Sequence, residues 1–134
     1  MSVNYAELAP GQEISSQAVV LDAATVSRYV EAVDDRSAGP PSEIAGGPTP
    51  PMAIAALTLR GVLNDLAIPG GAVHAGQELE FKGAVRVGET LACRATLAQN
   101  SVRGAWRFMV VRVQAEDSTG RIVMEGKSTI IVPA

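Results

Sequence analysis

Hydrophobic and polar positions change their spacing once along the chain, near residue 72. Before that point most apolar residues recur with a helical spacing, and after it they alternate with polar residues almost to the C-terminus. Apolar residues three or four apart line one face of a helix, whereas strict alternation lines one face of a strand. The sequence therefore predicts helices in its first half and an antiparallel sheet built mostly from its second half.

The first half opens with a short β-prone run, residues 12–21, followed by Asp22 in a position suited to an N-cap. A helix of about three turns is expected to follow and to stop at Asp34 and Asp35. Its apolar side would hold Val26, Tyr29, Val30 and Val33. The next segment, residues 36–48, is rich in Ser, Gly, Pro and Glu without periodicity, which predicts a loop.

A second helix is expected from Met52 to Leu66. Thr49 can cap it, while Pro50 and Pro51 occupy the first turn, where a missing N–H is tolerated. Its first two turns are apolar on every side, so the helix has to be covered on most sides. The turn at residues 68–71 ends it.

Half-buried strands are expected through the rest of the chain, around residues 78–82 and 90–97 and over residues 106–116 and 121–132. Residues 100–104 and 117–120 have the length and composition of hairpin turns. This order of elements predicts an α+β fold, a single domain over residues 1–134, in which an antiparallel sheet wraps one buried helix.

Composition excludes several classes of protein. The chain has 134 residues, 47% of them apolar, and a net charge of -3, which suits one packed domain and argues against a nucleic-acid partner. Without a long apolar span or a secretory signal, no membrane partner and a cytoplasmic location are expected. One Cys and one His cannot form a structural zinc site, so no metal and no cofactor are expected.

Four segments, in their order and spacing, resemble one known family. They are GGPTPP at residues 46–51, VHAGQELEF at 73–81, VRVGETL at 85–91 and EGKST at 125–129. Together they resemble the hot-dog fold of the MaoC-like hydratases and dehydratases, and most closely the N-terminal type of MaoC-like dehydratase domain. The resemblance implies a place in fatty-acid metabolism and acyl thioesters of coenzyme A or acyl carrier protein as substrates. It also implies hydration of 2-enoyl or dehydration of 3-hydroxyacyl chains, by domains that work in pairs.

The catalytic signature of the R-specific hydratases in that family resembles an Asp followed five residues later by a His. A carboxylate and an imidazole on one loop can share a water and divide the proton transfers. Here Asp34 or Asp35 corresponds to the Asp, but Gly39 and Pro40 lie five residues on, and the chain's one imidazole is His74. The alternative interpretation is a solvated helix end for the two acids and a hydrogen-bonded structural role for His74.

Substrate-binding residues are expected at the start of the second helix, where free N–H groups attract a thioester carbonyl or a phosphate. Two prolines weaken such a site by removing two donors. A turn and a helix cap are the alternative interpretation. The candidates are Gly46, Gly47, Thr49, Met52 and Ala53.

Three further side-chain types are candidates for a functional or structural role. Cys93 alternates with apolar residues and is interpreted as a small core residue. Most of the positive charge is arginine, which suits bidentate phosphate contact with coenzyme A or a solvated sheet face. Trp106 and Phe108 share a strand face and favour core or subunit-interface packing.

The preferred hypothesis is an acyl-thioester-binding subunit of a MaoC-like enoyl-thioester hydratase or 3-hydroxyacyl dehydratase, without the full catalytic dyad of its own. Exposed strand edges predict a homodimer, or a heterodimer with a second hot-dog subunit. One alternative is a self-sufficient homodimeric hydratase that uses Asp34 or Asp35 with His74. The others are a non-catalytic acyl-CoA binding module and a hot-dog thioesterase.

Overall fold

A five-stranded antiparallel sheet and one long helix dominate the computed structural model, which describes residues 3–38 and 41–134. Within these residues no helix is long and apolar enough to cross a membrane. The helices are η1 (Tyr5–Glu7), α1 (Ala23–Ala32), η2 (Arg36–Ala38), α2 (Pro41–Ile44) and α3 (Pro51–Asp65). The strands are β1 (Glu13–Val20), β2 (Val73–Phe81), β3 (Thr90–Arg103), β4 (Trp106–Glu116) and β5 (Ile122–Pro133).

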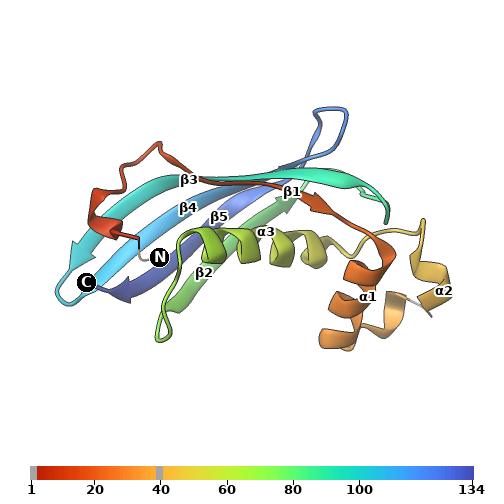
Figure 1. Cartoon of the computed structure of the whole chain (residues 1–134), viewed down its shortest axis with the longest axis horizontal. Coiled ribbons are helices and arrows are strands. Elements are labelled where there is room, and N and C mark those ends of the chain that lie inside the picture. The colour runs from red at the N-terminus through yellow and green to blue at the C-terminus, as the bar shows by residue number, and fades with distance from the viewer. Residues whose placement is uncertain (1–2, 39–40) are drawn as a thin grey trace.

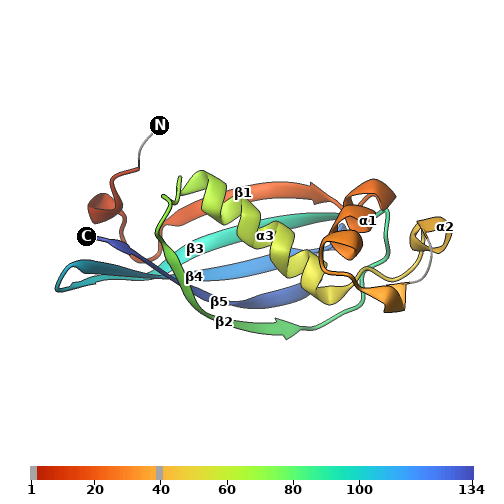
Figure 2. The same cartoon turned by 90° about the horizontal axis from the view of Figure 1, so that it is seen from below.

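The sheet has the strand order β1-β3-β4-β5-β2, and α3 crosses one of its faces (Figures 1 and 2). Alternate residues of the strands point toward α3 and form the core, because side chains of a strand alternate between the faces of a sheet. On β3 these are Leu91, Cys93, Ala95 and Leu97. The predicted α+β architecture, with an antiparallel sheet around one helix, is confirmed.

Local signals place the first helix. Asp22 is the N-cap of α1, and its carboxylate accepts a hydrogen bond from the backbone N–H of Thr25 at 2.7 Å. That hydrogen bond is the main reason that the pKa of Asp22 is lowered. The helix ends at Ala32, one residue before the last position of its expected apolar side. Val33 is therefore its C-cap and is 52% exposed rather than packed.

A polar clamp holds α3 against the edge strand β1. Gly61 has no side chain, and this lets the side chain of Gln17 approach the helix backbone. The Gln17 amide donates to the Gly61 carbonyl at 3.4 Å and to the Asp65 carboxylate at 3.2 Å. The Ser15 hydroxyl donates to the same carboxylate at 2.7 Å. This side of α3 is therefore fixed by hydrogen bonds as well as by apolar packing.

The other side of α3 is open to solvent. Ala53, Ile54, Ala55, Thr58, Gly61 and Val62 are buried, but Met52 is 48% exposed and Ala56 and Arg60 are exposed as well. The expectation that the helix is covered on most sides is not met by one chain, because a single sheet reaches only one side of it.

Two expectations about the strands are wrong. β2 is not half-buried: it is exposed along its length except at Leu79, because it lies at the edge of the sheet and extends beyond α3. The turn expected at residues 100–104 is shorter, since β3 stays paired with β4 as far as Arg103. The Asn100 side chain donates to the carbonyls of Tyr5 and Leu8, which ties the N-terminal segment to this long hairpin.

The expected loop over residues 36–48 contains two short helices, η2 and α2. Ile44 of α2 is buried in the core, which explains why the segment is ordered at that point. Gly39 and Pro40, the positions five residues after the acidic pair, lie outside the described residues.

Gly126 of β5 yields the first prediction, because a Cβ at this position would overlap the carbonyl oxygen of Glu78 on β2. We expect Gly126→Ala to push β2 away from β5 and to lower the free energy of unfolding by about 1–3 kcal/mol. Chemical denaturation measures this loss, and faster amide exchange in β2 locates it. Gly76→Ala on β2 is the control, since a Cβ there meets nothing within 4 Å; equal losses for both variants would contradict the prediction.

Candidate functional site

The start of α3 is reached through a tight glycine turn. Gly46 has φ +73°, a left-handed conformation that favours glycine. A Cβ on Gly47 would lie 2.9 Å from the Glu43 carbonyl oxygen, so the chain passes close to the end of α2 here. Both glycines are therefore required by the backbone path, and they bring the chain to the first turn of α3.

Thr49 does not cap α3, so that prediction is wrong. The N-cap is Pro50, and no side chain hydrogen-bonds to the helix start. Thr49 lies one residue too early because its backbone N–H donates to the Val85 carbonyl at 2.8 Å, which holds it against the segment after β2. Its hydroxyl is buried and has no hydrogen-bond partner among the described residues.

The helix start offers few hydrogen-bond donors. Pro50 and Pro51 have no N–H, and the N–H of Ala53 donates to the Pro50 carbonyl at 2.9 Å. Of the backbone N–H groups at positions 49–53, all within the described residues, only that of Met52 has no partner. An oxyanion is stabilised by several converging donors. One N–H and the helix dipole therefore provide an orienting contact for a carbonyl rather than a strong oxyanion hole.

Arg86 is the cationic side chain beside this helix start. Its guanidinium donates to the Gly46 carbonyl at 3.3 Å, and the neighbouring Val87 N–H donates to the Gly47 carbonyl at 2.8 Å. Arg86 is otherwise exposed and forms an isolated bridge with Pro48. Its other guanidinium N–H groups have no hydrogen-bond partner among the described residues, so they can meet a phosphate or carboxylate beside the glycine turn. The fold thus brings this arginine to the glycine turn.

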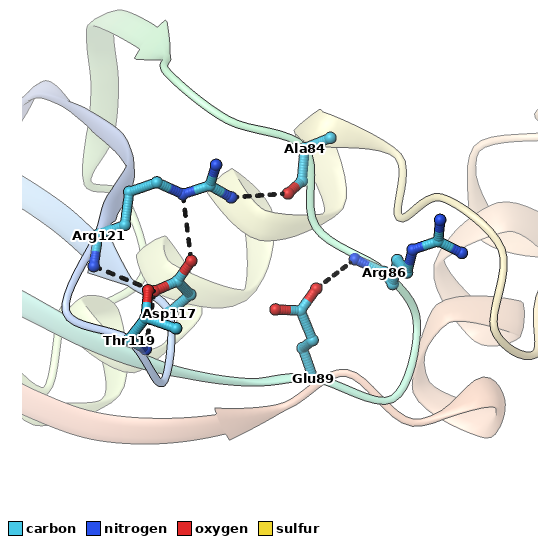
Figure 3. Close-up of polar contacts among 6 residues, drawn as sticks. All are labelled: Ala84, Arg86, Glu89, Asp117, Thr119 and Arg121. Atoms are coloured by element: carbon cyan, nitrogen blue, oxygen red, sulfur yellow. Dashed lines mark hydrogen bonds and ion pairs between the residues drawn. The ribbon is translucent and has the colours of Figure 1, made fainter.

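A network around Asp117 fixes the segment that bears Arg86 (Figure 3). The Asp117 carboxylate accepts from the hydroxyl of Thr119 at 2.6 Å and from Arg121, and the Arg121 guanidinium also donates to the Ala84 carbonyl at 3.2 Å. The Thr119 hydroxyl is the main reason that the pKa of Asp117 is lowered. Glu89 accepts from the Arg86 N–H at 2.6 Å. The β4–β5 turn thus anchors the connection that leads to the site.

The acidic pair occupies an exposed turn after α1. Asp34 has φ +52°, and its carboxylate lies 3.5 Å from the Arg36 guanidinium, with both side chains at least 79% exposed. The Asp35 carboxylate accepts from the N–H and hydroxyl of Ser37 at 3.0 and 2.6 Å. Both acids therefore make short-range surface contacts of the kind found at a solvated helix end.

His74 lies far from that pair within one chain. It is the second residue of β2, which begins just beyond the C-terminal end of α3, whereas the acids precede the N-terminal end (Figure 2). A 15-residue helix is about 22 Å long. His74 is exposed and pairs across the sheet with Ile130. One chain does not bring its imidazole and the two carboxylates together.

Cys93 is a core residue, as predicted. Its thiol is buried and lies 3.4 Å from the Thr58 hydroxyl. Burial raises the pKa of the thiol, which opposes formation of a nucleophilic thiolate. In the described part of the chain, no group of three His, Cys, Asp or Glu side chains could hold a metal ion.

Comparison with known proteins agrees with this architecture. The family model described as "FAS1-like, dehydratase domain region" matches residues 9–126. The curated (R)-specific enoyl-CoA hydratase of Rhodospirillum rubrum is 35% identical over 68 residues, which cover 50% of this chain and 45% of the relative. The matched segment thus spans about half the length of either protein.

Solved structures show the fold. The unliganded R-hydratase PhaJ1 of Pseudomonas aeruginosa has a TM-score of 0.73 at 19% identity, over 98% of this chain and 86% of that one. The truncated HadBC (3R-hydroxyacyl-ACP dehydratase) complex of Mycobacterium tuberculosis has a TM-score of 0.73 at 17% identity, over 98% and 100%. The expected hot-dog fold is confirmed.

The unpartnered hydroxyl of Thr49 leads to a second prediction. We expect Thr49→Val not to lower the free energy of unfolding and to raise it by about 1 kcal/mol, because the hydroxyl has no hydrogen bond to lose and its removal ends the cost of burying it unpaired. Thr58→Val is the matched control: that hydroxyl is buried and donates to the Ile54 carbonyl at 2.8 Å, so we expect a loss of about 1 kcal/mol. Urea denaturation of both variants decides, and a loss at Thr49 as large as that at Thr58 would show a partner for its hydroxyl.

Proposed function

The chain belongs to the FAS1-like family of dehydratase domain regions, and from this premise we propose that it is an acyl-thioester-binding subunit of a MaoC-like enoyl-thioester hydratase or 3-hydroxyacyl dehydratase. Such a reaction adds water across the C2–C3 double bond of the acyl chain or removes it. One group must take a proton from water or from C2, and another must give one back. We propose that a second hot-dog chain supplies those groups.

The separation of His74 from Asp34 and Asp35 is the observation that carries the proposal. A general acid and a general base must both come within hydrogen-bond reach of the same substrate. The one imidazole of this chain lies beyond one end of α3, and the two carboxylates lie near the other. These groups cannot act on one acyl chain held by a single subunit.

The helix start supports a binding role. Met52 offers one free N–H, and Arg86 offers an exposed cation beside the glycine turn. This pair suits the carbonyl and the phosphate groups of an acyl thioester of coenzyme A or of acyl carrier protein. Gly46, Gly47, Thr49 and Ala53 shape the backbone around these two contacts.

The open side of α3 and the edge of β2 support a paired assembly. An exposed edge strand has unpaired N–H and C=O groups, which a strand of another chain can satisfy. A second hot-dog subunit placed there would continue the sheet and cover Met52 and Ala56. We propose a heterodimer of this kind. A homodimer would also bring His74 of one copy nearer to the acids of the other, and this is how the self-sufficient alternative would work.

Activity assays with and without a partner test the proposed role. We expect the purified chain alone not to hydrate a 2-enoyl-CoA, a reaction that is measured as loss of the enoyl absorbance. It should become active when it is mixed with a co-encoded hot-dog chain that has Asp and His five residues apart. In that mixture His74→Gln should retain activity within about threefold, whereas loss of the partner's acid or base should lower it about 100-fold or more.

Each other outcome identifies an alternative. Turnover by the chain alone that His74→Gln abolishes would overturn the proposal in favour of the self-sufficient homodimer. Release of free thiol from the acyl-CoA would indicate a thioesterase. Binding of acyl-CoA without turnover in any pairing would indicate a binding module.

A charged residue on the open side of α3 tests the pairing itself. We expect Ala56→Glu to block association with the partner subunit, because it buries a carboxylate in an apolar contact, and to leave the fold intact, because Ala56 is exposed in one chain. The control is Ala24→Glu on α1, which is also exposed and helical. Light scattering measures the mass; unchanged association of the Ala56 variant would place the interface elsewhere.

A further inference from the structure

The face of the sheet away from α3 has an apolar band. β4 contributes Trp106, Phe108 and Val110, because the alternate residues Met109 and Val111 are in the core. In the cross-strand register Ile131 of β5 lies beside Phe108, and Val73 of β2 lies beside Ile131. Trp106 is 45% exposed and Val73 is 51% exposed. The solvated face of an antiparallel sheet is normally polar, so an apolar band there indicates a surface that becomes covered.

The same face has a charged band farther along the strands. Its side chains line a hollow of about 680 Å³. Arg94 and Arg112 lie on β3 and β4, and Glu78 and Glu80 lie on β2 at the other side of the hollow. Glu125 and Lys127 of β5 lie between them, and Lys127 forms an ion pair with Glu78 at 3.7 Å. Among the described residues neither arginine has an ion-pair partner, and neither has Glu80.

The register fixes how the two bands relate. Thr96, Arg112, Lys127 and Glu78 form one row across the strands, and Arg94, Gln114, Glu125 and Glu80 form the next. The apolar residues form rows at the other end of the same strands, where β3 adds Ser101 beside Phe108 and Arg103 beside Trp106. The Arg103 guanidinium lies 5.5 Å from the centre of the Phe108 ring. The face therefore varies from apolar to charged along the strands, and from positive to negative across them.

We propose that a second copy of this chain packs on this face, related by a two-fold axis parallel to the strands. Such an axis keeps each row at its own level, so apolar residues meet apolar residues, and it exchanges the β3 side for the β2 side. An axis above the gap between β4 and β5 places Arg94 of one copy opposite Glu80 of the other and Phe108 opposite Ile131. Arg112 then lies opposite Lys127, whose neighbours in the sheet are Glu78 and Glu125. Two sheets stacked in this way lie about 10 Å apart, within reach of these long side chains.

Other arrangements of two copies fit the face less well. An in-plane axis across the strands keeps each strand over its own copy and reverses the rows, so it would lay the apolar rows over the charged rows and bury charges without partners. The proposed axis avoids this and gives the unpaired Arg94 an acidic partner, Glu80. The contact uses neither the open side of α3 nor the edge of β2, so it is independent of the pairing proposed for function.

Charge reversal and charge exchange test this contact. Light scattering of the full chain should give a mass that Arg94→Glu halves and that Glu80→Arg halves as well. The double variant carrying both changes should restore the mass, since each copy then offers the exchanged charge to the other. Arg28→Glu, an exposed arginine of α1, is the control and should leave the mass unchanged.

The single tryptophan provides a second measurement on the same variants. Trp106 lies in the apolar band, so its fluorescence should be shielded from acrylamide in the wild type, exposed in Arg94→Glu and shielded again in the double variant. A wild-type mass equal to that of Arg94→Glu, or quenching that does not differ between them, would overturn the proposal.

Combination with Ala56→Glu separates this inference from the proposed function. These masses are measured in the mixture with the partner subunit. Loss of association in Ala56→Glu alone, with no effect of Arg94→Glu, would overturn the outer-face contact and leave the functional pairing intact. The reverse pattern would support the outer-face contact and contradict the pairing through α3. Halving by each change, and a monomer when both are combined, would support two separate interfaces.

Discussion

A single curved sheet can cover only one side of an apolar helix, and this constraint governs the structure. The buried side of α3 packs on the sheet and is clamped to β1 through Gly61 and Asp65. The opposite side, with Met52 and Ala56, faces solvent in one chain. Exposed apolar surface is unfavourable in water, and the proposed function therefore places a second subunit on this side of α3.

Local sequence patterns predicted the helices and strands well, but they did not predict contacts between residues that are distant in sequence. Asp22 caps α1 as expected, because an N-cap depends on hydrogen bonds within three residues. Thr49 failed as a cap because its N–H bonds to Val85, a residue 36 positions later. Alternation placed β2 as a strand, but its exposure follows from its place at the edge of the strand order, which periodicity within the strand does not encode.

The candidate site shows the same division. Residues adjacent in sequence, such as Gly46 and Gly47, were predicted together and lie together. Arg86 was only one of several arginines until folding brought it to the Gly46 carbonyl. The distance between His74 and the acidic pair depends on the length and direction of α3 between them. Spacing along the chain alone could not predict this separation.

The polar and apolar features together favour a subunit that holds a substrate over one that reacts with it. Two prolines at the start of α3 remove N–H donors that would stabilise an oxyanion, but their fixed φ favours the start of the helix. Asp34 and Asp35 are engaged by Arg36 and Ser37 at the surface. A helix start with one free N–H and one nearby cation can position a thioester without transferring its protons. In the function that we propose, the proton transfers belong to the chain that covers the open side of α3, and binding and catalysis are divided at the surface that one chain leaves uncovered.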